Sequence, residues 1–248
     1  MRDDTLKVLS IDFDYFQKVD WETLGHYPDG VDLGPELSRF IWANHYASPM
    51  DADKILSVDI DEGKIEHIKR IIENSWSIDT KVMICNSHKN IYKFIKDVYY
   101  ENGYIYNGVD IYNVDMHHDL FNNNSKVDCG NWVSHILKEI KGSSITWIAN
   151  PVSKEAYGFD DSRFSMISED LSDLDDIDFD VIFLCRSDIW SPPHLDSYFV
   201  DLSYDILSTY ENVLVEKSVL KERDCSDDIV NIQSMMREFT EREKRASR

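Results

Sequence analysis

The sequence has little positive charge for its length. Its 248 residues include 26 Lys and Arg against 47 Asp and Glu, which gives a net charge of −21. A protein that binds nucleic acid neutralises phosphates with basic side chains, so this charge argues against a nucleic-acid partner. A field of this sign attracts cations instead, either metal ions or basic peptides.

Long apolar runs, paired cysteines and flexible linkers are also missing. No segment approaches the roughly 18 apolar residues of a membrane span, and the first residues lack the apolar core of a secretory signal. We therefore expect a cytoplasmic protein with no membrane partner. The four cysteines show no CxxC spacing, which argues against a zinc knuckle or a disulfide framework. With 9 Gly, 6 Pro and no internal repeat, residues 1–248 are expected to form one domain.

Short apolar runs alternate along the chain with longer stretches of helical spacing. The runs predict strands at 7–11, 81–85, 111–114, 145–149, 181–185 and 213–215. The helical spacing predicts helices at 64–74, 90–100, 132–141, 197–210 and 228–244. Several runs are apolar at successive positions, as in parallel strands that are covered on both faces. The sequence thus predicts an α/β fold with three layers, α/β/α, around a mainly parallel sheet.

Two of the predicted strands lead into polar side chains spaced two residues apart. The first strand is followed by Asp12 and Asp14, and the third by Asp115, His117 and Asp119. Residues two apart on an extended chain point to the same side, so each set is expected to share a face. The pair alone is also compatible with a helix cap or a turn. The DxHxD set has little structural use and favours a metal site.

Crowded carboxylates repel one another unless a cation offsets their charge. His88, which follows the strand at 81–85, adds an imidazole, although a histidine at the start of a helix is often only a polar terminus. This set of nitrogen and oxygen donors without sulfur suits Mn²⁺, Fe²⁺, Co²⁺ or Zn²⁺, and bridging carboxylates allow two ions. In parallel sheets such sites lie at the carboxyl ends of the strands.

These motifs resemble those of the arginase and deacetylase superfamily of metal hydrolases. DMHHD at 115–119 resembles the arginase DxHxD motif, CNSH at 85–88 resembles the family's GGDHS turn, and Gly130-Asn131 leads into a helix as in arginases. One departure is that the arginase DxD pair normally follows these motifs, whereas here it lies on the first strand. The resemblance implies an arginase-like domain with a metal site at the carboxyl ends of the strands.

This order of motifs resembles a divergent branch, the peptide arginases of ribosomal peptide maturation. IDFDYF at 11–16, Asn131-Trp132, WIANP at 147–151 and CRSD at 185–188 carry that likeness. The resemblance implies hydrolysis of arginine residues in a precursor peptide to ornithine and urea, with two Mn²⁺ ions as cofactor. The first ion would be held by His88, Asp115, Asp119 and Asp12. The second would be held by Asp115, His117, Asp12 and Asp14.

The resemblance further implies a carboxylate that orients the substrate guanidinium, because the guanidinium's fork of donors matches two oxygens. Asp188 is the candidate for this role, and a turn-forming role is the alternative. The arginase proton shuttle is absent from its usual loop, because Trp132 follows Gly130-Asn131 at once. His118 beside the ligands and His45 in an aromatic segment are candidates, with a supporting role or a core position as the alternatives.

Three other functions remain open. A deacetylase-type amidohydrolase fits the DxHH reading of 115–118, although Asp119 and His88 exceed the needs of a single zinc ion. An arginase or agmatinase would act on a free guanidine, and a metal-stabilised protein would bind basic peptides without turnover. The shortened loop after Gly130-Asn131 and the acidic charge favour a peptide, since an internal arginine has no free carboxylate to hold.

Overall fold

The structure, a computed structural model, describes residues 5–28, 32–101, 106–121, 126–157 and 161–246. Seven strands form its central sheet: β1 (Thr5–Asp12), β4 (Lys81–Cys85), β5 (Gly108–Asp115), β6 (Ser144–Ala149), β7 (Met166–Ser168), β8 (Val181–Cys185) and β9 (Val213–Val215). The larger helices are α2 (Pro35–Ala47), α4 (Glu62–Asn74), α5 (Asn90–Glu101), α6 (Trp132–Glu139), α8 (Asp196–Thr209) and α9 (Ser226–Ala246). Short elements fill the connections: α1 (Trp21–Leu24), α3 (Ala52–Leu56), α7 (Ser153–Ala156), and a separate β2 (Gln17–Lys18) and β3 (Asp59–Ile60) pair.

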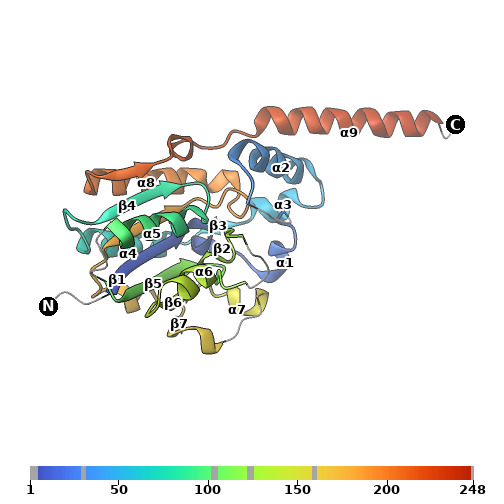
Figure 1. The fold of residues 1–248 in the computed structure, drawn as a ribbon. Helices are drawn as coiled ribbons and strands as arrows, with labels where there is room; N and C mark the ends of the chain where they lie inside the picture. Colours follow the sequence, from blue (N-terminus) through green and yellow to red (C-terminus); the bar gives the residue numbers. More distant parts are fainter. Residues whose placement is uncertain (1–4, 29–31, 102–105, 122–125, 158–160, 247–248) are drawn as a thin grey trace.

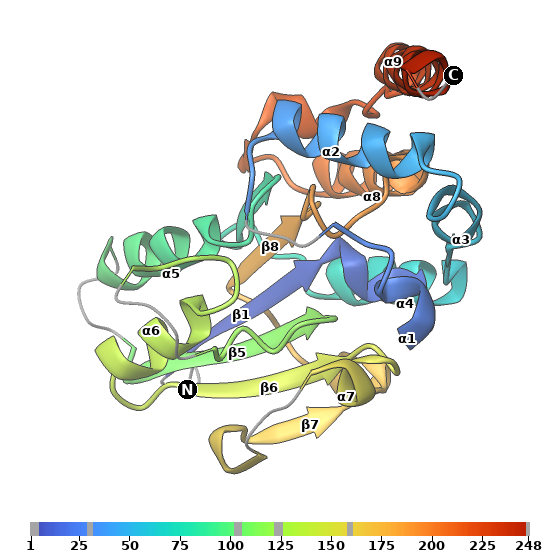
Figure 2. The same ribbon diagram turned by 90° about the vertical axis from the view of Figure 1, so that its right-hand side faces the viewer.

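The strands lie in the order β7-β6-β5-β1-β8-β4-β9, and every pair is parallel. β5, β6 and β7 extend the sheet on one side of β1, whereas β8, β4 and β9 extend it on the other (Figures 1 and 2). The direction in which the chain adds strands therefore reverses next to β1. In open parallel sheets, ligands bind beside such a reversal, at the carboxyl ends of the strands.

Helices cover both faces of the sheet, which confirms the predicted α/β/α layers. One face packs on α4 and α8 through residues such as Leu9 and Ile68, and the other packs on α5 and α6 through residues such as Val8 and Ile95. Side chains alternate along β1 between these two cores. All five residues of β8 are buried, as expected for a strand covered on both sides.

The predicted strands and helices are all present. The strands at 81–85, 181–185 and 213–215 have the predicted ends, and the ends of the others differ by one to three residues. α6 ends at Glu139 instead of 141, because Ile140 is already extended. The sequence pattern gave no prediction for α2. Its buried side chains face in two directions: Trp42 packs in the core that lies between the sheet and helices α4 and α8, whereas Ala43 and Ala47 pack against α9. No helix in the described part of the chain is long and apolar enough to cross a membrane.

Candidate metal centre

Six acidic and imidazole side chains meet at the carboxyl edge of the sheet, where the arrowheads of β1, β5 and β6 point the same way (Figure 2). All are at most 9% exposed: Asp12, Asp14, His88, Asp115, His117 and Asp119. They contain two groups of three whose ligand atoms lie within 4.8 Å of one another, and Asp115 belongs to both groups. These buried groups could hold metal ions.

The first group surrounds the ring of His88. The Nδ1 atom of His88 lies 3.1 Å from Asp12 Oδ2 and 3.3 Å from Asp115 Oδ2. Asp119 Oδ2 is also 3.1 Å from this nitrogen. A ring nitrogen donates at most one hydrogen, so it cannot satisfy three carboxylates at once. A cation between these atoms would satisfy all of them, which makes the group fit a metal ion.

The second group is built around His117. Its Nδ1 lies 3.0 Å from Asp14 Oδ2 and 3.6 Å from Asp115 Oδ1. Asp14 Oδ2 is buried and accepts no hydrogen bond, and His117 Nε2 has no hydrogen-bond partner either. Buried polar atoms are normally paired, so an orphaned carboxylate oxygen beside an imidazole nitrogen also fits a missing cation.

Tight turns, and not extended strands, bring these side chains together. β1 ends at Asp12, and Asp14 lies in the following 3-10 helix η1 (Phe13–Phe16) with its amide donating to Asp12 Oδ1. β5 ends at Asp115, and the amides of Met116 and His117 donate to Asp14 Oδ1 and Asp115 Oδ1. The prediction that each set shares one face of an extended chain is therefore wrong in its geometry. The side chains that it grouped nevertheless converge.

Backbone strain also concentrates at this edge. In the described ranges, the non-glycine residues with positive φ are Asp119 and Ser187, both at 51°. Asp119 faces His88, and the Ser187 hydroxyl donates to Asp12 Oδ2 at 2.5 Å. Residues in this conformation cost about 1 to 3 kcal/mol each and gather at functional sites.

The charges of the cluster are out of balance without a cation. Burial and the neighbouring Asp12 and Asp115 raise the pKa of Asp14, and burial with Asp115 raises the pKa of Asp119 to about 7. Burial would also raise the pKa of Asp115, but the two imidazoles outweigh it and hold that pKa well below its usual range. Carboxylates that resist ionisation in each other's presence are a usual feature of sites that bind a positive ion.

Four side chains for which the sequence predicted no role support the ligands. Ser10 Oγ lies 2.7 Å from His88 Nε2, which orients the ring, and the Asn113 amide donates to Asp115 Oδ2. Trp132 Nε1 donates to Asp119 Oδ2, and Ser187 donates to Asp12 as described. Ser10 and Asn113 each precede a ligand by two residues on the same strand. That spacing is the signal by which they could have been found.

Asp188 directly follows Ser187, which contacts Asp12, but its carboxylate is already paired with an arginine of the same chain. Its Oδ1 accepts from Arg186 Nε at 2.6 Å, and its Oδ2 accepts from Arg186 Nη2 at 3.3 Å. Arg223 and Trp42 donate to its backbone carbonyl. The carboxylate expected to orient a substrate guanidinium thus holds a guanidinium of its own chain.

The two histidines considered for proton transfer have other contacts. His118 is buried, accepts from the Leu120 amide through Nδ1 and packs its ring on Phe121 and Trp147. His45 lies on α2, where its Nδ1 is 3.7 Å from Asp51. Neither contact tests a proton-transfer role, so both roles stay predictions.

Two partly exposed aromatic rings flank the second group. The rings of Tyr157, which follows α7, and Trp190, which follows β8, each lie with their centroids 4.6 Å from that of His117. Burial, partly offset by His117, raises the pKa of Tyr157, so its phenol stays protonated. The surface beside the second group is therefore aromatic and neutral.

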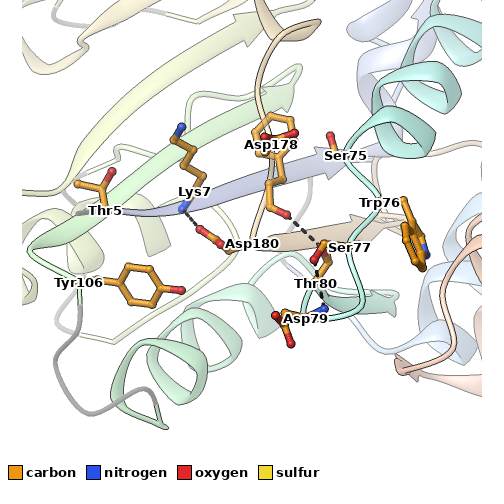
Figure 3. A pocket seen from close by; sticks show the side chains of 11 residues that line it. Thr5, Lys7, Ser75, Trp76, Ser77, Asp79, Thr80, Tyr106, Asp178 and Asp180 are labelled. Carbon is orange, nitrogen blue, oxygen red and sulfur yellow. Dashed lines mark hydrogen bonds between the residues drawn. The ribbon is translucent and has the colours of Figure 1, made fainter. Parts of the chain in front are cut away.

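A large cavity of about 710 Å³ lies elsewhere, at the amino ends of the strands (Figure 3). Its lining includes Thr5, Lys7, Asp178 and Asp180, and Asp180 accepts from the Lys7 amide. Asp178 and Asp180 precede β8, so this second DxD lies at the opposite edge of the sheet from the centre. It therefore lies too far along the strands to share a site with Asp12 and Asp14.

A comparison of the chain with protein-family models, curated proteins and solved structures finds no match. The functional conclusion therefore rests on the chemistry of the centre.

Proposed function

We propose that this protein is a hydrolase dependent on two divalent metal ions that cleaves the guanidinium group of arginine residues in a peptide, giving ornithine and urea. The observation that carries the proposal is the pair of buried Asp and His groups that share Asp115. A shared carboxylate is the usual bridge between two ions that activate one water molecule.

We assign Mn²⁺ to both sites, because the donor set suits it as it also suits Fe²⁺, Co²⁺ and Zn²⁺. His88, Asp12 and Asp115 would hold the first with Asp119 beside them, and the second group is Asp14, Asp115 and His117. The donors are imidazole nitrogens and carboxylate oxygens, and the buried thiols of Cys85 and Cys185 are not among them. When bound, the two ions supply a water acidified enough to act as a nucleophile near neutral pH.

The chain's own residues determine where a substrate lies and how water is excluded. Of the six ligand side chains His117 is the most exposed, at 9%, and Tyr157 and Trp190 lie beside its ring, so we place the substrate on this side. Aromatic ring faces attract planar cations. Asp188 would have to release Arg186 before it could hold a substrate guanidinium.

The reaction consumes one water and breaks one carbon–nitrogen bond. Water adds its oxygen to the guanidinium carbon, and the bond from that carbon to the side-chain nitrogen breaks. That nitrogen takes both protons of the water and leaves as the ornithine ammonium group, and neutral urea remains. The acidic character of the protein supports a basic substrate, because a net charge of −21 raises the local concentration of cationic peptides.

The test is a urea assay with Mn²⁺ on an arginine-containing peptide, free arginine and agmatine in parallel. We expect the peptide to react with a specificity constant at least about tenfold higher than that of free arginine, which corresponds to about 1.4 kcal/mol. Mass spectrometry should show loss of one CH₂N₂ unit per arginine. Asp115→Asn should abolish this loss.

Asp110→Asn is a matched control, because Asp110 lies on the same strand but binds Thr5 and Ser144 at its other end. Urea release from free arginine alone would indicate an ordinary arginase. Release of acetate from an acetyl-lysine peptide with one bound ion would indicate a deacetylase. Binding of basic peptides without any product would indicate a non-catalytic binder.

A further inference from the structure

The carboxylate that the sequence assigns to the substrate guanidinium is already paired. Asp188 accepts from the guanidinium of Arg186 through both of its oxygens. Proteins recognise planar cations in a second way, by stacking an aromatic ring on them. Two rings lie beside His117 where such a contact can form, namely those of Tyr157 and Trp190.

Trp190 presents its ring next to the most exposed of the candidate ligands. The ring is partly exposed, and its plane is tilted by 55° from that of His117. In the described ranges, no other aromatic ring and no cation packs on it. Tryptophan is the side chain that binds cations best through its ring. A cation that approaches His117 from solvent therefore passes an aromatic face that is not already in use for this kind of contact.

The turn that carries Trp190 is held by buried side chains through its carbonyl groups. The carbonyl of Asp188 accepts from Trp42 Nε1 at 2.8 Å and from Arg223 Nη1 at 2.5 Å. The carbonyl of Ser191 accepts from Arg223 Nη2 at 2.6 Å. These donors come from helix α2 and from the segment before α9, so two distant parts of the chain fix the residues on either side of Trp190.

Gln17, in β2, reaches the backbone of Trp190 itself. Its Nε2 donates to the Trp190 carbonyl at 2.9 Å, and its Oε1 accepts from the Tyr27 hydroxyl at 2.5 Å. Gln17 is 3% exposed and Tyr27 is 6% exposed. A reversed amide would set its oxygen against the Trp190 carbonyl, so Gln17 has one favourable orientation. The backbone that carries the ring is thus in place before a substrate arrives, which lowers the entropic cost of binding.

We propose that Trp190 selects arginine over lysine by stacking on the substrate guanidinium, and that Gln17 positions Trp190 for this contact. The proposal rests on the proposed function, because it names how that site recognises its substrate. A guanidinium is planar and weakly hydrated, so it gains more from an aromatic face than the compact, strongly hydrated ammonium of lysine. The two side chains carry the same charge, and the acidic field of the protein attracts both alike.

Isothermal titration of the full chain after chelation of metal ions tests this selection without turnover. The probes are two peptides that differ only in a single arginine or lysine. We expect the wild type to bind the arginine peptide at least about fivefold more tightly, which corresponds to about 1 kcal/mol. Trp190→Leu should reduce this ratio to less than about twofold, and Trp190→Phe should restore most of it. A ratio that Trp190→Leu leaves unchanged overturns the proposal.

Two further variants separate stacking by Trp190 from other effects. Trp76→Leu is the control, because Trp76 is 58% exposed and lies at the opposite edge of the sheet, so the ratio should not change. Tyr157→Leu removes the second ring beside His117. Loss of the preference in Tyr157→Leu but not in Trp190→Leu would assign the contact to the other ring and overturn the proposal. Circular dichroism of all variants checks that they are folded.

Urea release at saturating Mn²⁺ gives a second readout, in which any effect of a variant on metal affinity is removed. Trp190→Leu should raise KM for the arginine peptide at least about fivefold without lowering kcat. Stacking holds the planar guanidinium and does not strengthen as its carbon becomes tetrahedral, so the loss falls on binding. A fall in kcat with an unchanged KM contradicts a role in substrate recognition.

A double-mutant cycle tests the role of Gln17. Gln17→Met keeps the length of the side chain and removes its hydrogen bonds to Trp190 and Tyr27. It should weaken binding of the arginine peptide more than binding of the lysine peptide. The double variant Gln17→Met, Trp190→Leu should bind the arginine peptide as Trp190→Leu does, because Gln17 acts through Trp190. Additive losses in the double variant overturn the positioning role of Gln17.

The proposed hydrolysis and the proposed stacking fail in different ways. If the wild type releases urea from no substrate but shows a preference for the arginine peptide that depends on Trp190, then hydrolysis is refuted and recognition of arginine by Trp190 is supported. If the wild type releases urea from the arginine peptide but binds both peptides equally, then hydrolysis is supported and the stacking by Trp190 is overturned.

Discussion

Two buried clusters of charged side chains lie at the carboxyl edge of the sheet, the centre after β1, β4 and β5 and its neighbour after β8, and they satisfy their charges differently. The cluster at the centre has four carboxylates and two imidazoles. Its neighbour contains Arg186, Asp188, Asp196 and Arg223. In the neighbour each carboxylate has a guanidinium partner: Asp188 pairs with Arg186 and Asp196 with Arg223, at 2.6 Å in both pairs. The first cluster has two imidazoles for four carboxylates and no guanidinium, whereas the second has one guanidinium for each carboxylate.

The difference shows in the electrostatics. Burial would lower the pKa of the Arg223 guanidinium, but Asp196 outweighs burial and the pKa is raised. In the centre, by contrast, burial and the neighbouring carboxylates raise the pKa of Asp14. One oxygen of Asp14 also has no hydrogen-bond partner. A buried cluster that balances its charges is costly to break, whereas one that does not is suited to bind an ion from solution.

The largest effect is expected from removing a ligand at the centre. Asp12→Ala and His117→Ala should each lower activity by more than about 100-fold, because loss of residues that only support a metal ligand already costs 10- to 100-fold. Elemental analysis should find fewer than two Mn²⁺ per chain in both variants, with an unchanged circular dichroism spectrum. Two ions per chain in Asp12→Ala would exclude Asp12 as a ligand.

The opposite behaviour is expected in the neighbouring cluster. Asp196→Asn should lower the free energy of unfolding by about 3 to 5 kcal/mol, because it leaves Arg223 buried without its carboxylate. Urea denaturation measures this change. Asp205→Asn on the same helix is the control, since Asp205 pairs with Lys69 at the surface and its loss should cost about 0 to 1 kcal/mol. Metal content should not change in either variant, and a loss of Mn²⁺ from Asp196→Asn would contradict the separation of the two clusters.

Metal addition should stabilise the protein through the centre alone. At a free Mn²⁺ concentration of 100 times the dissociation constant, each bound ion adds about 2.7 kcal/mol to the free energy of unfolding. Thermal unfolding with and without Mn²⁺ checks this for the wild type. Asp115→Asn should lose most of the shift, and Asp196→Asn should keep it although the variant starts from a lower stability. An equal shift in both variants would place the bound ions outside the centre.

The sheet was predictable because its strands are covered on both faces. The run VIFLC at 181–185 is apolar throughout and is buried throughout. Helix α2 was not predictable in the same way, since its buried side chains face two different neighbours and Phe40 is exposed on a third side. No single stripe of period 3.6 then appears in the sequence.

The candidate ligands were predictable from spacing, but the route by which they meet was not. DxD and DxHxD predict convergence, yet the chain turns immediately after Asp12 and after Asp115, where side-chain oxygens accept backbone hydrogen bonds. Asp188 could not be assigned from sequence, because its partner Arg186 is only two residues away and nothing in the pattern shows that they pair. The residue type of Ser10 gives no specific signal, and only its spacing of two residues before Asp12 points to it.

Substitution of Ser10 is expected to have the smallest effect of these variants, and it tests the orientation of His88 directly. Its hydroxyl lies 2.7 Å from His88 Nε2, on the side of the ring away from the carboxylates. This contact fixes which nitrogen faces the ligand group, so Ser10→Ala should weaken Mn²⁺ binding by about tenfold, or 1.4 kcal/mol, without removing a ligand. Isothermal titration measures the affinity, and saturating Mn²⁺ should restore most of the activity. Ser203→Ala is the control, because Ser203 is equally buried but donates only to a carbonyl within α8. If both serine variants bind Mn²⁺ as tightly as the wild type, then Ser10 does not orient His88 for metal binding, and the contact between them is no evidence that the first group binds an ion.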